Sequence, residues 1–197
     1  MIIKKYLATL RFYLRLNLSR EFGEQIQEII RDLSPTNPAS GQRYPLNRLL
    51  VMVIGSPLSG KSAYIQNSPL KDYFTVDRKA IRNALMNKIP FLDGNQKIGG
   101  LNDWEQWIAI WYIHRTLFQK GFQSGVAIAS DFRNSQRRKW KKILDLAKKL
   151  QYKTRIIYFF TPPERWFRET EPLRGKADSL AIYNSETGEL KELQNPA

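Results

Sequence analysis

The chain lacks cysteine altogether, contains a single histidine and has no long uninterrupted apolar run. Without cysteine, a disulfide scaffold is excluded. No short apolar run is followed by a small-residue cleavage site, so the sequence indicates no cleaved secretory signal and predicts a cytoplasmic location. The most apolar segment is interrupted by Arg11, Arg15 and Arg20, so we expect no membrane span.

Acidic residues are also scarce, because 18 Asp and Glu stand against 32 Lys and Arg. The resulting net charge of +14 and isoelectric point near 10.0 favour a polyanionic partner. Nucleic acid fits best, because neutralising its phosphates releases counterions. The positive charge would equally attract acidic lipid headgroups or nucleotides alone. A further alternative is that the excess lysine only keeps the protein soluble.

The 197 residues, 42% of them apolar, are enough for one domain with a buried core. Residues 1 to 33 are predicted to form helices, because apolar residues recur there at helical spacing: Leu7, Leu10, Leu14, Leu18, Phe22, Ile26, Ile29 and Ile30. Residues 33–41 are rich in turn formers and read as a linker. We therefore expect a basic helical extension with linker over 1–45 and the main domain over 46–197.

The main domain alternates between short apolar runs and helical patterns, which predicts an α/β fold with a parallel β-sheet sandwiched by helices. Strands are expected over residues 49–54, 73–76, 126–130 and 153–160, and helices over residues 78–88, 104–120 and 135–150. In the second helix Trp104, Trp107, Trp111 and His114 are expected to pack in the core. The tail around residues 183–190 is expected to form a hairpin.

Between the first predicted strand and the following helix lies a complete G-x-x-x-x-G-K-S motif: Gly55, Ser56, Pro57, Leu58, Ser59, Gly60, Lys61 and Ser62. This is the P-loop pattern, in which backbone N–H groups surround the phosphates of a nucleotide. Lys61 would place a positive charge between the β- and γ-phosphates, and the Ser62 hydroxyl would bind Mg²⁺. The motif and its context predict an ATP and Mg²⁺ site on a P-loop NTPase fold.

Kinases fit this chain better than other P-loop proteins do. The residues after Lys61 are too few for the helical lid domain and sensor elements of a ring ATPase, and no guanine-reading N-K-x-D signature is present. A kinase needs a carboxylate near the acceptor hydroxyl, and Asp77 at the end of the second predicted strand is the candidate base. It can equally be the N-cap of the next helix. Arg78 and Arg82 could bind an acceptor phosphate, or be ordinary exposed arginines.

The third predicted strand ends at Asp131, at the same edge of the sheet as the P-loop. Its carboxylate could accept a hydrogen bond from a Mg²⁺-bound water or orient the acceptor, or simply belong to a turn. After Pro162 and Pro163, a lid is expected to bring an arginine onto the migrating phosphoryl group. The candidates are Arg165, Arg168 and Arg174.

Residues 48–175 resemble the polynucleotide kinase branch of P-loop kinases, typified by the bacteriophage 5′-hydroxyl polynucleotide kinase domain. The resemblance lies in the P-loop, in the run from Thr75 to Arg82, and in the later strand and basic helix. It implies that Asp77 is the general base and that Arg78 or Arg82 binds the acceptor phosphate. It also implies that Asp131 and Asn134 lie at the substrate, with Arg138 in the basic helix, and that Arg165 or Arg168 closes over the transition state.

These observations favour an ATP-dependent kinase whose acceptor is the 5′-hydroxyl of DNA or RNA. Two alternatives stay open. One is a kinase for a small hydroxylated metabolite. The other is a nucleotide-binding nucleic-acid adaptor with little turnover, in which residues 1–45 bind the nucleic acid.

Overall fold

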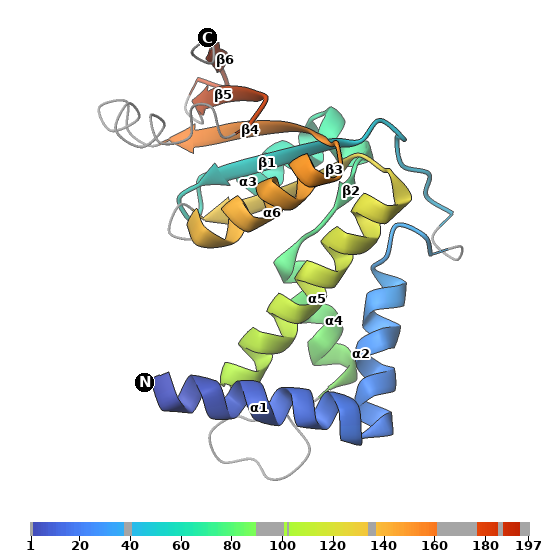
Figure 1. Ribbon diagram of the computed structural model, residues 1–197. Coiled ribbons are helices and arrows are strands. Elements are labelled where there is room, and N and C mark those ends of the chain that lie inside the picture. Colours follow the sequence, from blue (N-terminus) through green and yellow to red (C-terminus); the bar gives the residue numbers. More distant parts are fainter. Residues whose placement is uncertain are drawn as a thin grey trace. The chain divides into compact units, whose positions relative to one another are not determined.

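The computed structural model describes residues 2–37, 41–89, 101, 103–133, 137–160, 177–184 and 187–193 (Figure 1). The chain divides into two compact units. Residues 1–42 and 77–120 form one, which we call the helical unit, and residues 43–76 and 121–197 form the other, the sheet unit. Helix α5 (Asp103–Ser124) belongs to the helical unit up to Lys120, and its last turn belongs to the sheet unit.

The sheet unit is built on six strands in the order β2-β3-β1-β4-β5-β6. Their bounds are β1 Leu49–Gly55, β2 Phe74–Thr75, β3 Ile128–Arg133, β4 Lys153–Phe160, β5 Ser179–Asn184 and β6 Leu190–Leu193. The pairs from β2 to β5 are parallel, and β5 pairs with β6 antiparallel. The predicted α/β fold with a mostly parallel sheet is confirmed, and so is the tail hairpin.

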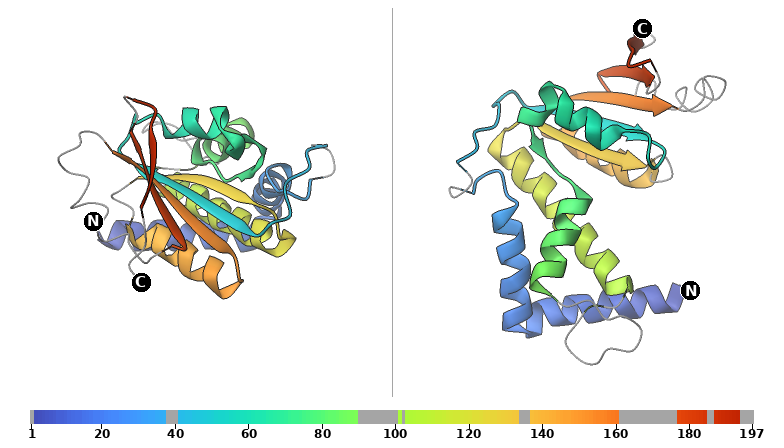
Figure 2. Two further views of the ribbon diagram at one scale, coloured as in Figure 1. Left: turned by 90° about the horizontal axis from the view of Figure 1, so that it is seen from above. Right: turned by 180° about the vertical axis from the view of Figure 1, so that it is seen from behind.

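Helices cover both faces of this sheet. The short helix α3 (Lys61–Asn67), followed by the 3-10 turn η2 (Pro69–Asp72), lies on one face, and α6 (Arg137–Lys149) lies on the other (Figures 1 and 2). The sheet order explains this, because the chain crosses from β1 to β2 in one direction and from β3 to β4 in the other. Right-handed crossovers in opposite directions place their helices on opposite faces. A strand buried on both faces must be apolar throughout, as β1 is.

The core beneath α3 consists of residues from α3, η2 and the three strands β1, β3 and β4: Val51, Val53, Ile65, Leu70, Ala129, Ile157 and Phe159. On the other face, α6 buries Trp140, Ile143, Leu144 and Ala147, and its lysines at positions 141, 142, 148 and 149 are exposed. Several boundaries differ from the sequence expectation, among them both ends of β3. Strand β3 continues to Arg133, so Asp131 lies within the strand rather than just after it.

The helical unit contains α1 (Ile2–Leu18), α2 (Arg20–Asp32), α4 (Arg78–Lys88) and most of α5. Ser19 separates the first two helices, because its hydroxyl accepts a hydrogen bond from the N–H of Phe22 at 3.3 Å and caps α2. Lys88 joins α4 to α2 through Glu28 at 2.7 Å and Asp32 at 3.1 Å. The predicted helices of the N-terminal segment are therefore present and pack with α4 and α5.

The tryptophans of α5 only partly follow the sequence expectation. Trp104 and Trp107 are each more than a third exposed, and Trp111 is half-buried. His114 is fully buried, as predicted, and its ring stacks on Trp111 with a centroid separation of 5.4 Å. Helical spacing placed these side chains on one broad face, but the unit covers only part of that face.

Within the sheet unit, the buried Tyr152, just before β4, forms a hydrogen bond with the last turn of α5. The hydroxyl of Tyr152 donates one bifurcated hydrogen bond, shared between the carbonyl oxygens of Gly121 at 3.1 Å and Phe122 at 3.2 Å. Burial raises the pKa of Tyr152 above 10.0, although Arg48 lowers it in part. Replacing Tyr152 with phenylalanine is expected to lower the free energy of unfolding at pH 7 by about 1 kcal/mol, measured by denaturant titration.

The same substitution should alter the alkaline limb of the stability profile. A phenol whose pKa is raised in the folded state contributes stability below its unfolded pKa of 10.0 and loses it as the pH rises through the folded value. Tyr152→Phe should therefore lose less stability than the wild type as the pH rises above about 9. Tyr6→Phe, at an exposed position, is the control. Equal losses in Tyr152→Phe and the wild type would contradict this role.

Candidate functional site

The loop from Gly55 to Ser62 connects the end of β1 to the start of α3 in the sheet unit. Gly55 pairs with Phe159 on the neighbouring strand β4. A Cβ at position 55 would lie 2.7 Å from the Phe159 Cβ and 2.8 Å from the Phe159 carbonyl oxygen. Only glycine can occupy this position without moving a strand, so the first residue of the motif is required by packing as well as by the turn.

Two residues of the loop adopt left-handed backbone conformations. Gly60, just before α3, has φ +84°, which glycine adopts without strain. Leu58 has φ 63°, a conformation uncommon for a residue with a β-carbon, and its side chain is fully exposed. Because Gly60 has no side chain, the first N–H groups of α3 receive no side-chain cap. Strained backbone of this kind is concentrated at ligand-binding loops.

Lys61 extends back over the loop rather than into solvent. Its side chain is 6% exposed, and its ammonium donates hydrogen bonds to the Ser56 carbonyl and, at 3.2 Å, to the Ser59 hydroxyl. A buried ammonium keeps its charge only where oxygen atoms surround it, and both acceptors belong to the loop itself. The loop therefore holds a positive charge at its centre, as phosphate binding requires.

Ser62 and Asp131 meet although they are far apart in the sequence. The Ser62 hydroxyl donates to the Asp131 carboxylate at 3.4 Å. Strands β1 and β3 are neighbours, with Val53 opposite Asp131, which brings this carboxylate to the loop that follows β1. The chain leaves β1 and β3 in opposite directions, and ligands bind open α/β sheets at such a switch point.

A hydroxyl and a carboxylate at this separation suit Mg²⁺, which prefers oxygen ligands and usually binds one or two protein side chains together with phosphates and water. Among the residues that the structure describes, no three His, Cys, Asp or Glu side chains gather into a metal site.

The residue before Asp131 also ties the site together. The buried Ser130 hydroxyl donates to the Val76 carbonyl at 2.6 Å, and the N–H of Val76 donates to the Ala129 carbonyl at 3.0 Å. These bonds fix the end of β2 against β3. Sequence reasoning did not single out Ser130, although a hydroxyl within a buried apolar strand is a signal that it has a partner.

The other predicted residues of the acceptor side lie in the helical unit. Asp77 is the N-cap of α4, where its Oδ1 accepts from the N–H of Lys79 at 2.8 Å. The Arg78 guanidinium lies over the Trp111 ring, 6.0 Å from its centroid, and Arg82 is exposed. The structure thus brings Gly55–Ser62 and Asp131 together in one unit and places these three residues in the other.

Several predicted residues fall outside the described part of the chain. They are Asn134 and the three arginines Arg165, Arg168 and Arg174. Arg138 belongs to α6, of which the backbone is described at that position. The predicted lid therefore stays a prediction.

Three aromatic side chains that the sequence did not reveal as a cluster pack together next to the start of the Gly55–Ser62 loop. Tyr64 on α3, Phe159 on β4 and Tyr183 on β5 have ring centroids 4.5–5.2 Å apart. Burial raises the pKa of Tyr64 above 10.0, which the nearby Arg155 guanidinium partly offsets. Phe159 in this cluster is the residue that approaches Gly55, so the cluster braces the start of the loop.

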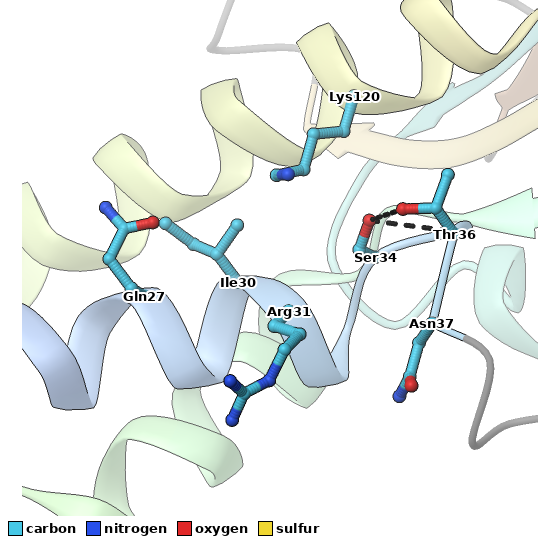
Figure 3. A pocket seen from close by; sticks show the side chains of 7 residues that line it. All are labelled: Gln27, Ile30, Arg31, Ser34, Thr36, Asn37 and Lys120. Carbon is cyan, nitrogen blue, oxygen red and sulfur yellow. Dashed lines mark hydrogen bonds between the residues drawn. The ribbon is translucent and has the colours of Figure 1, made fainter.

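The helical unit contains a separate polar cavity of about 290 Å³ (Figure 3). It lies between the end of α2, residues 34–37 and Lys120, and the Ser34 hydroxyl inside it contacts the Thr36 hydroxyl at 3.0 Å. Its cationic groups, Arg31 and Lys120, point in different directions (Figure 3). None of the lining residues was a predicted site residue.

No helix in the described ranges is long and apolar enough to cross a membrane.

Comparisons with known proteins agree with this fold. One similar solved structure comes from the PezAT chromosomal toxin–antitoxin system of the human pathogen Streptococcus pneumoniae. It is 13% identical with a TM-score of 0.61, and the match covers 89% of this chain and 80% of that one. A second is the AvrRxo1-ORF1:AvrRxo1-ORF2 complex with sulphate ions, at 13% identity and a TM-score of 0.51, covering 86% and 63%. At such identities the likeness concerns the fold alone.

No curated protein matches the chain. A family model described as an AAA domain (AAA_33) matches residues 50–178, which is more than half of the sequence and includes the P-loop, Asp77 and Asp131. The sheet order, the loop after β1 and the Ser62–Asp131 contact are the features that a P-loop nucleotide site requires. The chain therefore belongs to the AAA domain family and has a P-loop NTPase-like fold.

Proposed function

We propose that this protein is an ATP- and Mg²⁺-dependent phosphotransferase that moves the γ-phosphoryl group of ATP onto a hydroxyl, and that the acceptor is the 5′-hydroxyl of a polynucleotide. The observation that carries the proposal is the hydrogen bond from Ser62 to Asp131 beside a complete G-x-x-x-x-G-K-S loop. The cytoplasm, where ATP and Mg²⁺ are plentiful, is the proposed location.

The donor side of the reaction is assigned to the sheet unit. When bound, Mg²⁺ and ATP supply the phosphoryl group and neutralise part of its charge. Lys61 would exchange its bonds to Ser56 and Ser59 for bonds to phosphate oxygens, and this exchange would put its charge where negative charge develops. Ser62 and Asp131 would hold the metal, directly or through water.

The acceptor side is assigned to Asp77, Arg78 and Arg82. The capping bond of Asp77 uses Oδ1, and Oδ2 is the oxygen that we assign to accepting the proton of the attacking hydroxyl. Arg78 or Arg82 would bind the acceptor phosphate, and Asn134 would also contact the acceptor. Arg165 or Arg168, with Arg174 as a further candidate, would neutralise charge on the phosphoryl group from a lid.

A polynucleotide acceptor is supported by charge. The chain has a net charge of +14, and part of the excess lies on the exposed face of α6 in the sheet unit, at Lys141, Lys142, Lys148 and Lys149. A polyanion gains affinity from such a surface through counterion release, whereas a small neutral metabolite does not. The resemblance of the Thr75–Arg82 run to polynucleotide kinases points the same way. The similarity to a toxin–antitoxin structure, at 13% identity, does not choose the acceptor.

Product analysis with γ-labelled ATP tests this proposal. Label is expected on a 5′-hydroxyl oligonucleotide and not on the same oligonucleotide with a 5′-phosphate. Asp77→Asn should abolish transfer while ATP binding persists, and Asp72→Asn, at an exposed position in η2, is the matched control. Label on a metabolite from a panel would replace the polynucleotide with a small acceptor. Salt-sensitive oligonucleotide binding without labelled product, lost on deleting residues 1–45, would make the protein an adaptor.

The metal assignment gives a separate expectation. Replacing Asp131 with asparagine removes the carboxylate charge but keeps the oxygen that accepts from Ser62, so the loop should stay folded. The Mg²⁺ concentration needed for half-maximal turnover should rise by about 10–100-fold. Asp145→Asn, on the exposed side of α6, should leave this concentration unchanged. An unaltered Mg²⁺ dependence in Asp131→Asn would remove Asp131 from the metal site.

A further inference from the structure

Helix α1 has two apolar faces, and the helical unit covers only one of them. Ala8 and Phe12 are buried, and the Phe12 ring packs against Phe22 and Tyr112 with centroids 5.8 and 5.7 Å away. The other face carries large apolar side chains that are 44–79% exposed: Tyr6, Leu7, Leu10, Tyr13, Leu14 and Leu18.

The position of these side chains on the helix is regular. At about 100° per residue they fall within an arc of about 140°, away from Ala8 and Phe12. Within the helical unit, α2, α4 and α5 lie on one side of α1 in both side views (Figures 1 and 2). An arc of this width is broader than the narrow seam of a two-helix coiled coil, so it fits a wide surface better than a single partner helix.

An exposed apolar face of this size requires an explanation. Scattered apolar residues on a surface are ordinary, but a contiguous group on one face marks a site of interaction. The Leu7, Leu10 and Leu14 side chains are also spaced to form a continuous ridge along the helix.

The charges of α1 indicate what covers this face. The helix contains Lys4, Lys5, Arg11 and Arg15 and no aspartate or glutamate. Arg11 lies at the edge of the exposed apolar face. Its side chain is 68% exposed, although its Nε lies 3.5 Å from Oε1 of the buried Glu105. At about 100° per residue, Arg11 lies nearest the exposed face, about 20° beyond Leu18, so a cation borders the apolar surface.

We propose that the exposed face of α1 is a membrane-docking surface, with which the protein lies on an anionic lipid bilayer without crossing it. The leucines would enter the boundary between headgroups and acyl chains, and Tyr6 and Tyr13 would lie at headgroup level, where amphipathic rings are favoured. Arg11 at the edge would meet lipid phosphates. The net charge of +14 would draw the whole protein toward the same surface. This role is independent of the proposed phosphotransfer.

Co-sedimentation of the full chain with lipid vesicles tests the proposal. Vesicles of phosphatidylcholine with about 30% phosphatidylglycerol are expected to bind the wild type, and vesicles of phosphatidylcholine alone are not. The double variant Leu10→Asp with Leu14→Asp should lower the partition coefficient by at least about tenfold, because two leucines that would be buried in lipid become charged. Raising the salt from about 0.1 M to about 0.5 M should weaken binding several-fold.

The matched control is Leu46→Asp with Met86→Asp, which makes the same charge change at exposed apolar residues outside α1. It should bind vesicles within about twofold of the wild type, and both double variants should keep the wild-type melting temperature and nucleotide binding. Two outcomes would overturn the proposal: equal vesicle binding by the α1 variant and the wild type, or no binding to anionic vesicles at all. A wild-type dimer in light scattering that the α1 variant abolishes would assign the face to self-association instead.

Discussion

Replacing Lys61 with methionine is expected to lower the rate of ATP turnover by about 10²–10³-fold while the chain stays folded. Methionine keeps most of the apolar stem of a side chain that is 6% exposed and removes only the ammonium. The lost charge acts where negative charge accumulates on the phosphoryl group, so the rate should fall more than the affinity for ATP. Single-turnover kinetics and equilibrium ATP binding, measured side by side, separate the two effects.

The Lys61 ammonium donates to the Ser56 carbonyl and the Ser59 hydroxyl, so methionine also leaves these two oxygens without that donor. The melting temperature should therefore fall slightly, because Ser59 is buried and only the half-buried Ser56 can bond to water instead. Lys71→Met, at an exposed cation of η2, controls for the loss of one positive charge. If the turnover rate of Lys61→Met stayed within about threefold of the wild-type rate, the assigned role would be refuted. A change of that size is no larger than what an ordinary surface substitution causes.

Replacing Gly55 with alanine is expected to destabilise the sheet unit by about 1–3 kcal/mol and to abolish nucleotide binding. The new methyl group would lie 2.7–2.8 Å from the Cβ and carbonyl oxygen of Phe159, and a backbone atom of a paired strand cannot move aside as a flexible side chain can. Relief requires β1 and β4 to separate at their carboxyl ends, just where the loop begins. Denaturant titration and ATP binding measure the two consequences.

Gly41→Ala is the comparison for this variant. Gly41 has φ +62° with no atom within 4 Å of the added Cβ, so alanine there meets strain but no clash. Its cost should be about 1 kcal/mol, with nucleotide binding unchanged. If Gly55→Ala kept both wild-type stability and ATP binding, then the close approach of β4 to the loop would not limit this position.

The phosphate loop is the part of the protein that could be read from sequence. A glycine-bounded octapeptide after an apolar strand needs no distant partner to be recognised, because its chemistry depends on local backbone and on Lys61. The parallel sheet was equally readable, since β1 is apolar throughout and helical patterns follow it. Strand-end aspartates were candidates for the same reason, and Asp131 does meet Ser62 at 3.4 Å.

Contacts between strands that are distant in the sequence could not be predicted from local sequence patterns. The approach of Phe159 to Gly55 depends on β4 lying beside β1, and no local pattern encodes the order of strands in a sheet. The same holds for the cluster of Tyr64, Phe159 and Tyr183, which joins three elements of the sheet unit. The hydroxyl of Ser130 needed the end of β2 as its partner, and this too follows from strand order.

The amino-acid sequence by itself determined that α1 is a helix, that a P-loop containing a lysine and a serine follows β1, and that the sheet is buried on both faces. Each of these depends on a periodicity or a motif within a few turns of chain. Which side of α1 faces solvent was decided only by the tertiary structure. Ala8 and Phe12 are buried and Leu10 and Leu14 are exposed, because the side of α1 that carries Ala8 and Phe12 packs against the rest of the helical unit. Both faces carry large apolar side chains, and the contacts of the folded neighbours decide which of them is buried.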